Sequence, residues 1–402
     1  MTDTLTCGAA RVDITPGYEV DLSGFAGRQN PAIGVLDPIH ARAAVFDNGA
    51  CRVVVVSLDI LELTRADADA FRLLAAQQAR TRPEHVCIAC THTHAAPATY
   101  PLKECGTVSW RFVDDLRAHI GQVVNAAAGQ VRPVRFAWAT APLDIGANRR
   151  GHTEADRTLR VLAATDDAGR CVCAILHYAC HGVCLTGGNR LISGDWPGGM
   201  CSRLEQALGA DSVAMFMNGC AGDIAPRSDH MGSEAGLQVA VARASDAATT
   251  AWARLQVTAG TGLSAGARIV ALPYVCPGPG GETAMPVCLQ HLTLGPVEIV
   301  ALSGEVLFGI GQGIQDHSGR NDLWVAAYCN GGHGYICTDQ ALAEGGYEPD
   351  GSNYYYDRPA LAAGAERTLI EAGIRWPDGL PRSARAEDLT PRAGTLRLKR
   401  NP

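Results

Sequence analysis

Residues 85–94 read HVCIACTHTH, a short apolar run that ends in two histidines separated by a threonine. The apolar part, 85–90, has the length and composition of a buried β-strand. Open α/β sheets place their binding sites at strand ends, so the histidine pair predicts a functional site at the end of this strand.

Four other apolar runs also end in turns that carry polar side chains. These turns hold His181 after 172–176, Asn218 to Asp223 after 212–217, Gly304-Glu305 after 299–302, and Asn330 to Tyr335 after 325–329. A catalytic zinc site takes nitrogen and oxygen ligands and leaves one position open for water. Two histidines, a glutamate and a tyrosine from separate strand ends could supply that set.

Predicted strands alternate with predicted helices along most of the chain. Helices are expected over 64–80, 110–131, 197–208, 233–254, 305–315 and 358–372. Strands are expected over 52–60, 85–90, 134–140, 158–164, 171–179, 212–217, in two segments of 257–274, and over 287–294, 297–302 and 323–329. The pattern is typical of the α/β class, with a layered mixed β-sheet core and flanking helices.

The composition is that of a globular protein with a sizeable core: 402 residues, of which 47% are hydrophobic and 19% charged. It excludes a disordered chain. The net charge of −7 excludes a basic footprint for nucleic acid, and the lack of an apolar stretch of about 18 residues argues against stable membrane insertion. The first eight residues lack a secretory leader pattern, and the 15 cysteines are expected to be reduced core residues. We therefore expect a cytoplasmic protein.

Spacing limits which histidines can bind one ion together. On an extended segment His92 and His94 share a face but lie about 6.6 Å apart, so both reach one ion only if the chain bends sharply there. His177 and His181 have the i, i+4 spacing of helical zinc pairs, but their segment reads as a strand, which would hold them about 13 Å apart. His181 is therefore the ligand candidate, and His177 is expected to be a core residue.

Two other patterns favour structural interpretations. Cys87 and Cys90 match a CxxC pattern, but they lie inside a predicted strand without a second CxxC, so we expect them to fill the core. Residues 262–266, GLSAG, match the letters of a nucleophile elbow, which needs a helix after it. A strand-like segment follows instead, so a hairpin turn is expected.

The polar clusters, in this order, resemble the motifs of the N-terminal catalytic domain of the neutral (non-lysosomal) ceramidase family. The similar stretches are GAARVDITP at 8–16, THTH at 91–94 with Pro97 and Tyr100, Asn148-Arg149 before a D-x-x-L-x-V-L segment at 156–162, His181 followed by NRLISGD at 189–195, GDIAP at 222–226, Gly304-Glu305, and Gly334-Tyr335-Ile336 with Tyr347-Glu348. The length alone suggests two or three domains. The resemblance instead implies one large catalytic domain over 1–376, followed by a tail over 377–402.

The resemblance also implies roles for individual residues. In that family the first histidine of THTH, the later histidine, the glutamate and the tyrosine hold zinc. The matching residues, expected to hold Zn²⁺ here, are His92, His181, Glu305 and Tyr335. The residues expected to line the reacting group are His94, Arg149 and Tyr347.

The implied activity is that of a zinc-dependent amidohydrolase, which cleaves a C–N amide bond through a metal-bound water. His94 is expected to move a proton between the water and the leaving group. Tyr347 or Arg149 is expected to stabilise the oxyanion. Asp223 or Asp195 is expected to orient a ligand histidine.

Two departures from the family pattern bear on the substrate. Ala225 stands where the family has the serine of G-D-x-S-P, so a serine nucleophile at this position is excluded. The chain also stops where the family's ceramide hydrolases carry a further β domain. The expected substrate is therefore a small or N-acylated amide rather than ceramide itself.

The residues leave two alternative functions open. One is a zinc lactonase or esterase that acts on a small polar metabolite, and the other is a non-catalytic, zinc-bearing binding protein. In each case the expected partner is a small molecule. The polar, arginine-rich stretch 378–402 is expected to pack on a neighbouring copy, which favours a homo-oligomer.

Overall fold

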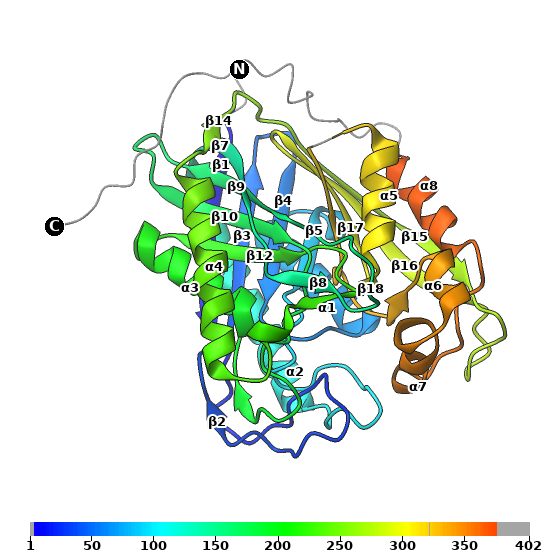
Figure 1. Cartoon of the computed structure of the whole chain (residues 1–402). Helices are drawn as coiled ribbons and strands as arrows, with labels where there is room; N and C mark the ends of the chain where they lie inside the picture. Colours follow the sequence, from blue (N-terminus) through cyan, green and yellow to red (C-terminus); the bar gives the residue numbers. More distant parts are fainter. Residues whose placement is uncertain (1–3, 321, 376–402) are drawn as a thin grey trace.

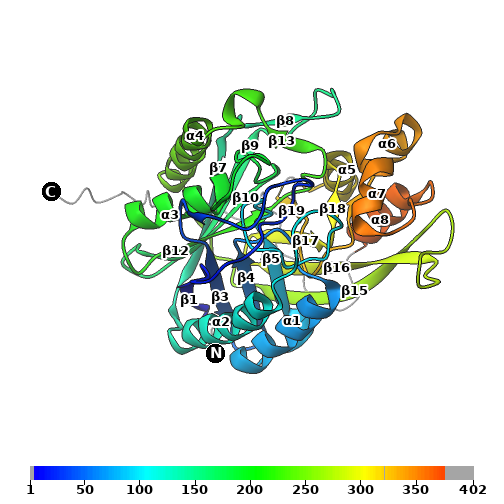
Figure 2. The same cartoon turned by 90° about the horizontal axis from the view of Figure 1, so that it is seen from below.

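Three mixed β-sheets pack their inner faces against one another, and helices cover their outer faces (Figures 1 and 2). The computed structural model describes residues 4–320 and 322–375, so the predicted tail over 377–402 lies outside the described residues. The arrangement confirms the predicted α/β class with a layered sheet core. Across the described residues, none of the helices has both the length and the apolar character that crossing a membrane requires.

The first sheet contains the strand that leads to the histidine pair. Its order is β5 (Val86–Cys90), β4 (Arg52–Leu58), β3 (His40–Asp47), β1 (Thr6–Asp13) and β6 (Arg132–Pro133), and helices α1 (Arg65–Ala79) and α2 (Trp110–Gly129) cover its outer face. Side chains alternate along a strand. In β4, Val54 and Val56 therefore pack toward the helices, while Val53 and Val55 face the other sheets.

The second sheet leads to His181. Its order is β12 (Val213–Asn218), β10 (Cys171–Tyr178), β9 (Thr158–Thr165), β7 (Arg135–Pro142) and β14 (Gln256–Val257), and its helices are α3 (Asp195–Leu208) and α4 (Glu234–Trp252). Every residue of β10 is buried, which explains its continuous apolar sequence. His177 lies inside this strand, where its ring stacks on Trp324 at 5.3 Å, as expected of a core residue.

The third sheet leads to Glu305. Its order is β15 (Leu263–Pro273), β16 (Ala284–Leu294), β17 (Val297–Leu302) and β19 (Leu323–Ala326), with α5 (Phe308–Ser318) and α8 (Ala365–Ile374) beside it. The GLSAG stretch enters β15 and continues as a strand. It is therefore neither a nucleophile elbow nor the hairpin turn that the sequence predicts.

The inner faces of the three sheets form one apolar cluster. Phe46 of the first sheet and Phe136 of the second pack with their ring centroids 5.5 Å apart. Ile299 and Trp324 of the third sheet belong to the same cluster. This shared core holds the ends of the sheets in fixed relative positions, so polar residues that follow strands of different sheets can lie close together.

The ends of the strands and the turns that follow them are joined to one another by short backbone pairings. Thr93 pairs with Gly182, Ala89 with Cys329, and Gly219 with Ala326. Three two-stranded sheets add to this end of the molecule or flank it: β18 (Glu305–Val306) with β20 (Tyr335–Ile336), β13 (Ile224–Pro226) with β8 (Gly146–Asn148), and β2 (Gly34–Val35) with β11 (Leu191–Ile192). The predicted gathering of strand ends is therefore confirmed.

Several helix boundaries agree with the sequence because the expected capping residues are used. The side chains of Thr64, Ser109 and Ser233 accept backbone N–H bonds at the starts of α1, α2 and α4. The last helix is the largest error, since α8 starts at Ala365 rather than at 358. Proline disfavours helical backbone in the residue before it, and Pro359 stands at the predicted start. Two short helices that the sequence does not predict, α6 (Asp339–Glu344) and α7 (Ser352–Tyr356), precede it.

Candidate metal centre

Three histidine side chains meet where β5 and β10 end. The ring centroid of His92 lies 4.8 Å from those of both His94 and His181. The Nε2 atoms of His92 and His94 are 3.2 Å apart. One potential ligand atom from each of the three residues lies within 4.8 Å of the others, so the cluster has the dimensions of a metal site.

A sharp bend at His92 brings the first two rings together. The backbone φ of His92 is 64°, in the left-handed region that residues other than glycine seldom adopt. The extended spacing expected of His92 and His94 does not apply, because the bend turns both imidazoles toward the same point. Their spacing in the sequence requires a sharp bend for His92 and His94 to reach one ion together, and the structure has that bend.

Each imidazole is oriented by a backbone carbonyl group that accepts a hydrogen bond from its Nδ1. The acceptors are Leu61 O for His92 at 3.0 Å, Gly24 O for His94 at 2.9 Å and Ala221 O for His181 at 2.7 Å. A neutral imidazole carries one N–H, so these bonds place the proton on Nδ1 and leave a lone pair on Nε2. The three lone pairs converge on one another.

The carboxylate of Glu305 faces the same point. Its Oε2 atom lies 3.1 Å from Nε2 of both His92 and His181. Burial lowers the pKa of His181 to about 4, and burial also holds the pKa of His94 well below its usual value. The imidazole lone pairs and a carboxylate oxygen thus face one another, and nitrogen and oxygen atoms of this kind are common ligands of zinc, so the residues present fit a divalent cation.

Tyr335 lies next to Glu305 because β18 pairs in parallel with β20, with these two residues in register. The hydroxyl of Tyr335 accepts a hydrogen bond from the guanidinium of Arg149 at 2.9 Å. Burial raises the pKa of Tyr335 well above its usual value, although Arg149 opposes that effect. The structure brings the predicted tyrosine to the edge of the centre, and its binding to a metal stays a prediction.

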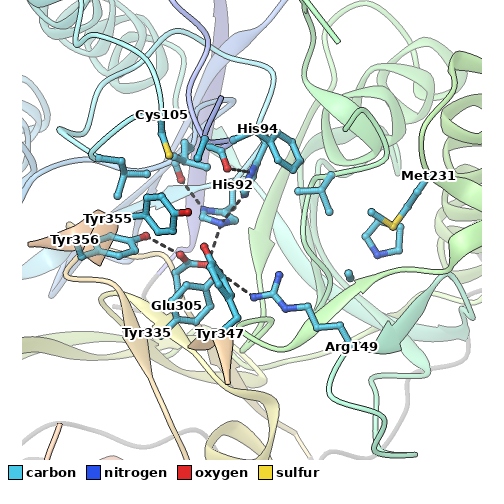
Figure 3. Close-up of a pocket in the computed structure, with 18 of the residues that line it drawn as sticks. His92, His94, Cys105, Arg149, Met231, Glu305, Tyr335, Tyr347, Tyr355 and Tyr356 are labelled. Atoms are coloured by element: carbon cyan, nitrogen blue, oxygen red, sulfur yellow. Dashed lines mark hydrogen bonds and ion pairs between the residues drawn. The ribbon is translucent and has the colours of Figure 1, made fainter. Parts of the chain in front are cut away.

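Arg149 is fixed by three internal hydrogen bonds at the side of the centre. Besides Tyr335, its guanidinium donates to Gly222 O at 2.8 Å and to Glu348 Oε1 at 2.7 Å. The guanidinium lies 5.5 Å from the ring centroids of both Tyr335 and Tyr347. Tyr347 is half exposed at the mouth of the site, so these residues form one wall of the pocket (Figure 3).

Asp223 has a different position from the one expected. Its carboxylate accepts hydrogen bonds from Asn148 Nδ2 and from the backbone N–H of Phe308, both at 2.8 Å. His181 is oriented by backbone carbonyl groups, not by this carboxylate. Asp223 instead anchors the turn that carries Arg149 and the start of α5, which explains why the helix begins at 308 after the short strand of Glu305.

Asp195 also acts on the backbone rather than on an imidazole. Its carboxylate accepts N–H bonds from Cys184, Leu185 and Trp196. The indole of Trp196 in turn donates to His181 O at 2.8 Å. The expected orientation of His181 by Asp195 is therefore indirect and acts on the chain that carries the histidine.

His92, His94 and Glu305 line a cavity of about 490 Å³ (Figure 3). Most of its other lining is apolar or aromatic, including Phe25, Leu102, Val183, Met231 and Tyr355. Ala225 also lines it and contributes a methyl group where a serine would offer a hydroxyl. The pocket combines a polar centre with apolar walls, as substrate sites commonly do.

The sequence patterns do not identify two residues that lie close to the centre. Tyr356, at the end of α7, donates its hydroxyl to Glu305 Oε1 at 2.6 Å, and Glu62 lies 3.2 Å from the same hydroxyl. Glu62 follows the buried strand β4, at the edge of the sheet where β5 also ends. This position after a buried strand is the feature of the sequence that could have identified it. Tyr356 belongs to the run Tyr354 to Tyr356, whose composition alone does not indicate a site.

The fold and the site define an α/β protein with a candidate metal centre at the ends of its strands. No family model matches the sequence. The neutral ceramidase of Mycobacterium tuberculosis (strain ATCC 25618 / H37Rv) is 24% identical over 263 residues, which cover 56% of this chain and 41% of that protein. The match therefore spans less than half of the length of this curated relative.

Solved structures extend the likeness over almost the whole chain. Neutral ceramidase from Pseudomonas aeruginosa superposes with a TM-score of 0.77 at 19% identity, covering 92% of this chain and 73% of that one. A ceramidase complexed with C2 superposes with a TM-score of 0.78 at 18% identity, covering 95% and 77%. The chain resembles the neutral ceramidases in fold and, over part of its length, in sequence, which confirms the resemblance predicted from the motifs.

Proposed function

We propose that this protein is a zinc-dependent hydrolase that cleaves the amide C–N bond of a small or N-acylated substrate. The observation that carries the proposal is the meeting of three imidazole groups, two of which face the Glu305 carboxylate at 3.1 Å, beside a largely apolar pocket. The likeness to ceramidases supports the type of bond, since ceramide is an amide.

His92, His181 and Glu305 would hold the ion, because Oε2 of Glu305 faces both of these histidines at the same distance. Tyr335 would complete the ligand set from the neighbouring strand. When bound, zinc acidifies water and polarises a carbonyl group.

The remaining residues act on the substrate itself. The Nε2 lone pair of His94 can take a proton at the centre and pass it to the leaving nitrogen. The guanidinium of Arg149, already held in place, can donate to the carbonyl oxygen as negative charge develops there, and the hydroxyl of Tyr347 can donate from the mouth of the pocket. The apolar walls exclude water around the reacting bond.

Replacement of His94 by alanine separates a proton-transfer role from a ligand role. We expect His94→Ala to retain bound zinc and to lose about 10²- to 10⁴-fold in kcat, the usual contribution of a general acid–base group. Zinc content by atomic emission and kcat on the same sample check this. Loss of zinc from the variant would show instead that His94 is a ligand.

A hydrolysis screen tests the proposed function as a whole. The purified protein is incubated with N-acyl amides, small cyclic amides and lactones, before and after metal removal by a chelator and after zinc is restored. Zinc-dependent hydrolysis of an amide supports the proposal. Hydrolysis of lactones or esters alone favours the esterase alternative, and activity on none of the compounds by a zinc-loaded protein favours the binding protein.

We also propose that residues 1–376 work as a single catalytic unit in a reducing compartment such as the cytoplasm. The shared core of the three sheets supports the single unit. All 15 cysteines are free of disulfide bonds in the described part of the chain, which fits a reducing compartment.

A further inference from the structure

A second buried carboxyl group, that of Glu62, lies behind the candidate centre. Glu62 is only 1% exposed and follows β4. Its Oε1 atom has no hydrogen-bond partner among the described residues, and its Oε2 atom lies 3.2 Å from the hydroxyl of Tyr356. A buried carboxylate with an unpaired oxygen is costly, so the environment favours the neutral acid.

The hydroxyl of Tyr356 connects this group to Glu305. It lies 2.6 Å from Glu305 Oε1, the distance of a hydrogen bond from a hydroxyl to a carboxylate. A tyrosine has one hydroxyl proton. If Tyr356 donates this proton in its hydrogen bond to Glu305, its 3.2 Å contact with Glu62 can be a hydrogen bond only when a protonated Glu62 donates to the tyrosine oxygen.

The protonation of Glu62 agrees with this direction. Burial raises the pKa of Glu62 well above its usual value, and the charge of Glu305 raises it further. Oε1 of Glu305 accepts the 2.6 Å hydrogen bond from the Tyr356 hydroxyl, and a contact this short is typical of a carboxylate acceptor. The hydrogen bonds thus run from the neutral acid of Glu62, through the phenol of Tyr356, to the carboxylate of Glu305.

The backbone makes room for Glu62. A Cβ atom added to Gly332 would lie 1.6 Å from Oε1 and 1.7 Å from Cδ of Glu62, so no larger residue fits there while the carboxyl group keeps its place. Gly332 belongs to the turn after β19, and its N–H donates to Leu63 O at 2.8 Å. Two segments far apart in sequence are therefore shaped around this one carboxyl group.

We propose that Tyr356 and Glu62 are positioning residues that orient the carboxylate of Glu305 for metal binding. Tyr356 holds Oε1, which leaves Oε2 turned toward His92 and His181. Glu62 holds Tyr356 by donating to its oxygen. The inference rests on the proposed metal centre and adds to it the two residues that set the direction of its only carboxylate ligand.

The test measures zinc affinity of the metal-free full chain by competition with a chromogenic chelator, without any substrate. We expect Tyr356→Phe to lower the affinity about 10- to 100-fold, the usual effect of removing a group that orients a metal ligand. The visible spectrum of the Co²⁺-loaded variant should also change. Tyr100→Phe is the matched control, because it removes a hydroxyl from a ring that packs 5.5 Å from Tyr356, and it should bind zinc as the wild type does.

Glu62 is tested by a pair of substitutions. Glu62→Gln should keep an affinity close to that of the wild type, because its amide can donate to Tyr356 as the acid does. Glu62→Leu removes the donor and should weaken binding. Circular dichroism and unfolding curves recorded in chelator show whether each variant is folded. If Tyr356→Phe does not fold, the zinc affinity of Glu62→Leu decides whether the positioning role holds.

The outcomes distinguish the two proposals. Wild-type protein that binds zinc tightly, together with folded Tyr356→Phe and Glu62→Leu variants of equal affinity, overturns the positioning role and leaves the proposed function standing. Wild-type protein that binds no zinc overturns both.

Discussion

His92→Ala is expected to abolish zinc binding at the centre and to lower kcat/KM roughly a thousandfold or more. His92 is the central member of the cluster, since its Nε2 atom faces both the ring of His94 and the carboxylate of Glu305. Its removal takes away one ligand and leaves Glu305 with a single facing imidazole. Zinc content and amide hydrolysis, measured on the same preparation, check the expectation.

His317→Ala is the matched control for this substitution. His317 is exposed on α5, where its Nδ1 donates to Gly313 O within the same helix. We expect this variant to keep its zinc and its activity. Retention of both zinc and full hydrolysis by His92→Ala would show that the proposed ligand assignment is wrong.

The second large effect is expected from Arg149→Gln. Hydrogen bonds to Tyr335, Gly222 and Glu348 hold the guanidinium before a substrate arrives, so it needs no reorganisation as charge develops on a carbonyl oxygen. We expect kcat to fall about 10²- to 10³-fold, the usual cost of losing one such donor. Zinc content measured in excess zinc should stay at the wild-type value, because Arg149 is not a ligand.

The steady-state parameters distinguish this role from simple substrate binding. A rise in KM with kcat unchanged would mean that Arg149 contributes equally to the bound substrate and the transition state, which contradicts the assigned role. Arg135→Gln serves as the control, because Arg135 is an exposed arginine paired with Asp167 on the surface. Its kinetics should match those of the wild type.

The main elements of the fold are predictable from local sequence. Strands such as β4 and β10 are continuous β-branched or apolar runs, and the long helices begin at capping side chains. Strand β3 is missed because its sequence, HARAAVFD, is rich in alanine, which has little preference for strands. Its place is set by pairing with β1 and β4, which local sequence does not encode.

The site is predictable in outline, because apolar strands followed by polar turns bring their side chains to one edge. The bend at His92 is not predictable from composition, since it requires a left-handed backbone at a residue that usually avoids it. The Glu62 and Tyr356 contacts depend on tertiary packing, because their residues are separated by most of the chain. The position of Asp223 also depends on packing, through bonds to Asn148 and Phe308.

The candidate ligands come from the ends of three different sheets, one histidine from the first, one from the second and the glutamate from the third. An ion bound there would join the sheets at a single point, outside the apolar core that they share. The unfolded chain has no such arrangement, so binding would add directly to the free energy of unfolding, by about 2.7 kcal/mol at a free zinc concentration one hundred times Kd. The thermal stability of this protein would then report how much of its population carries the ion.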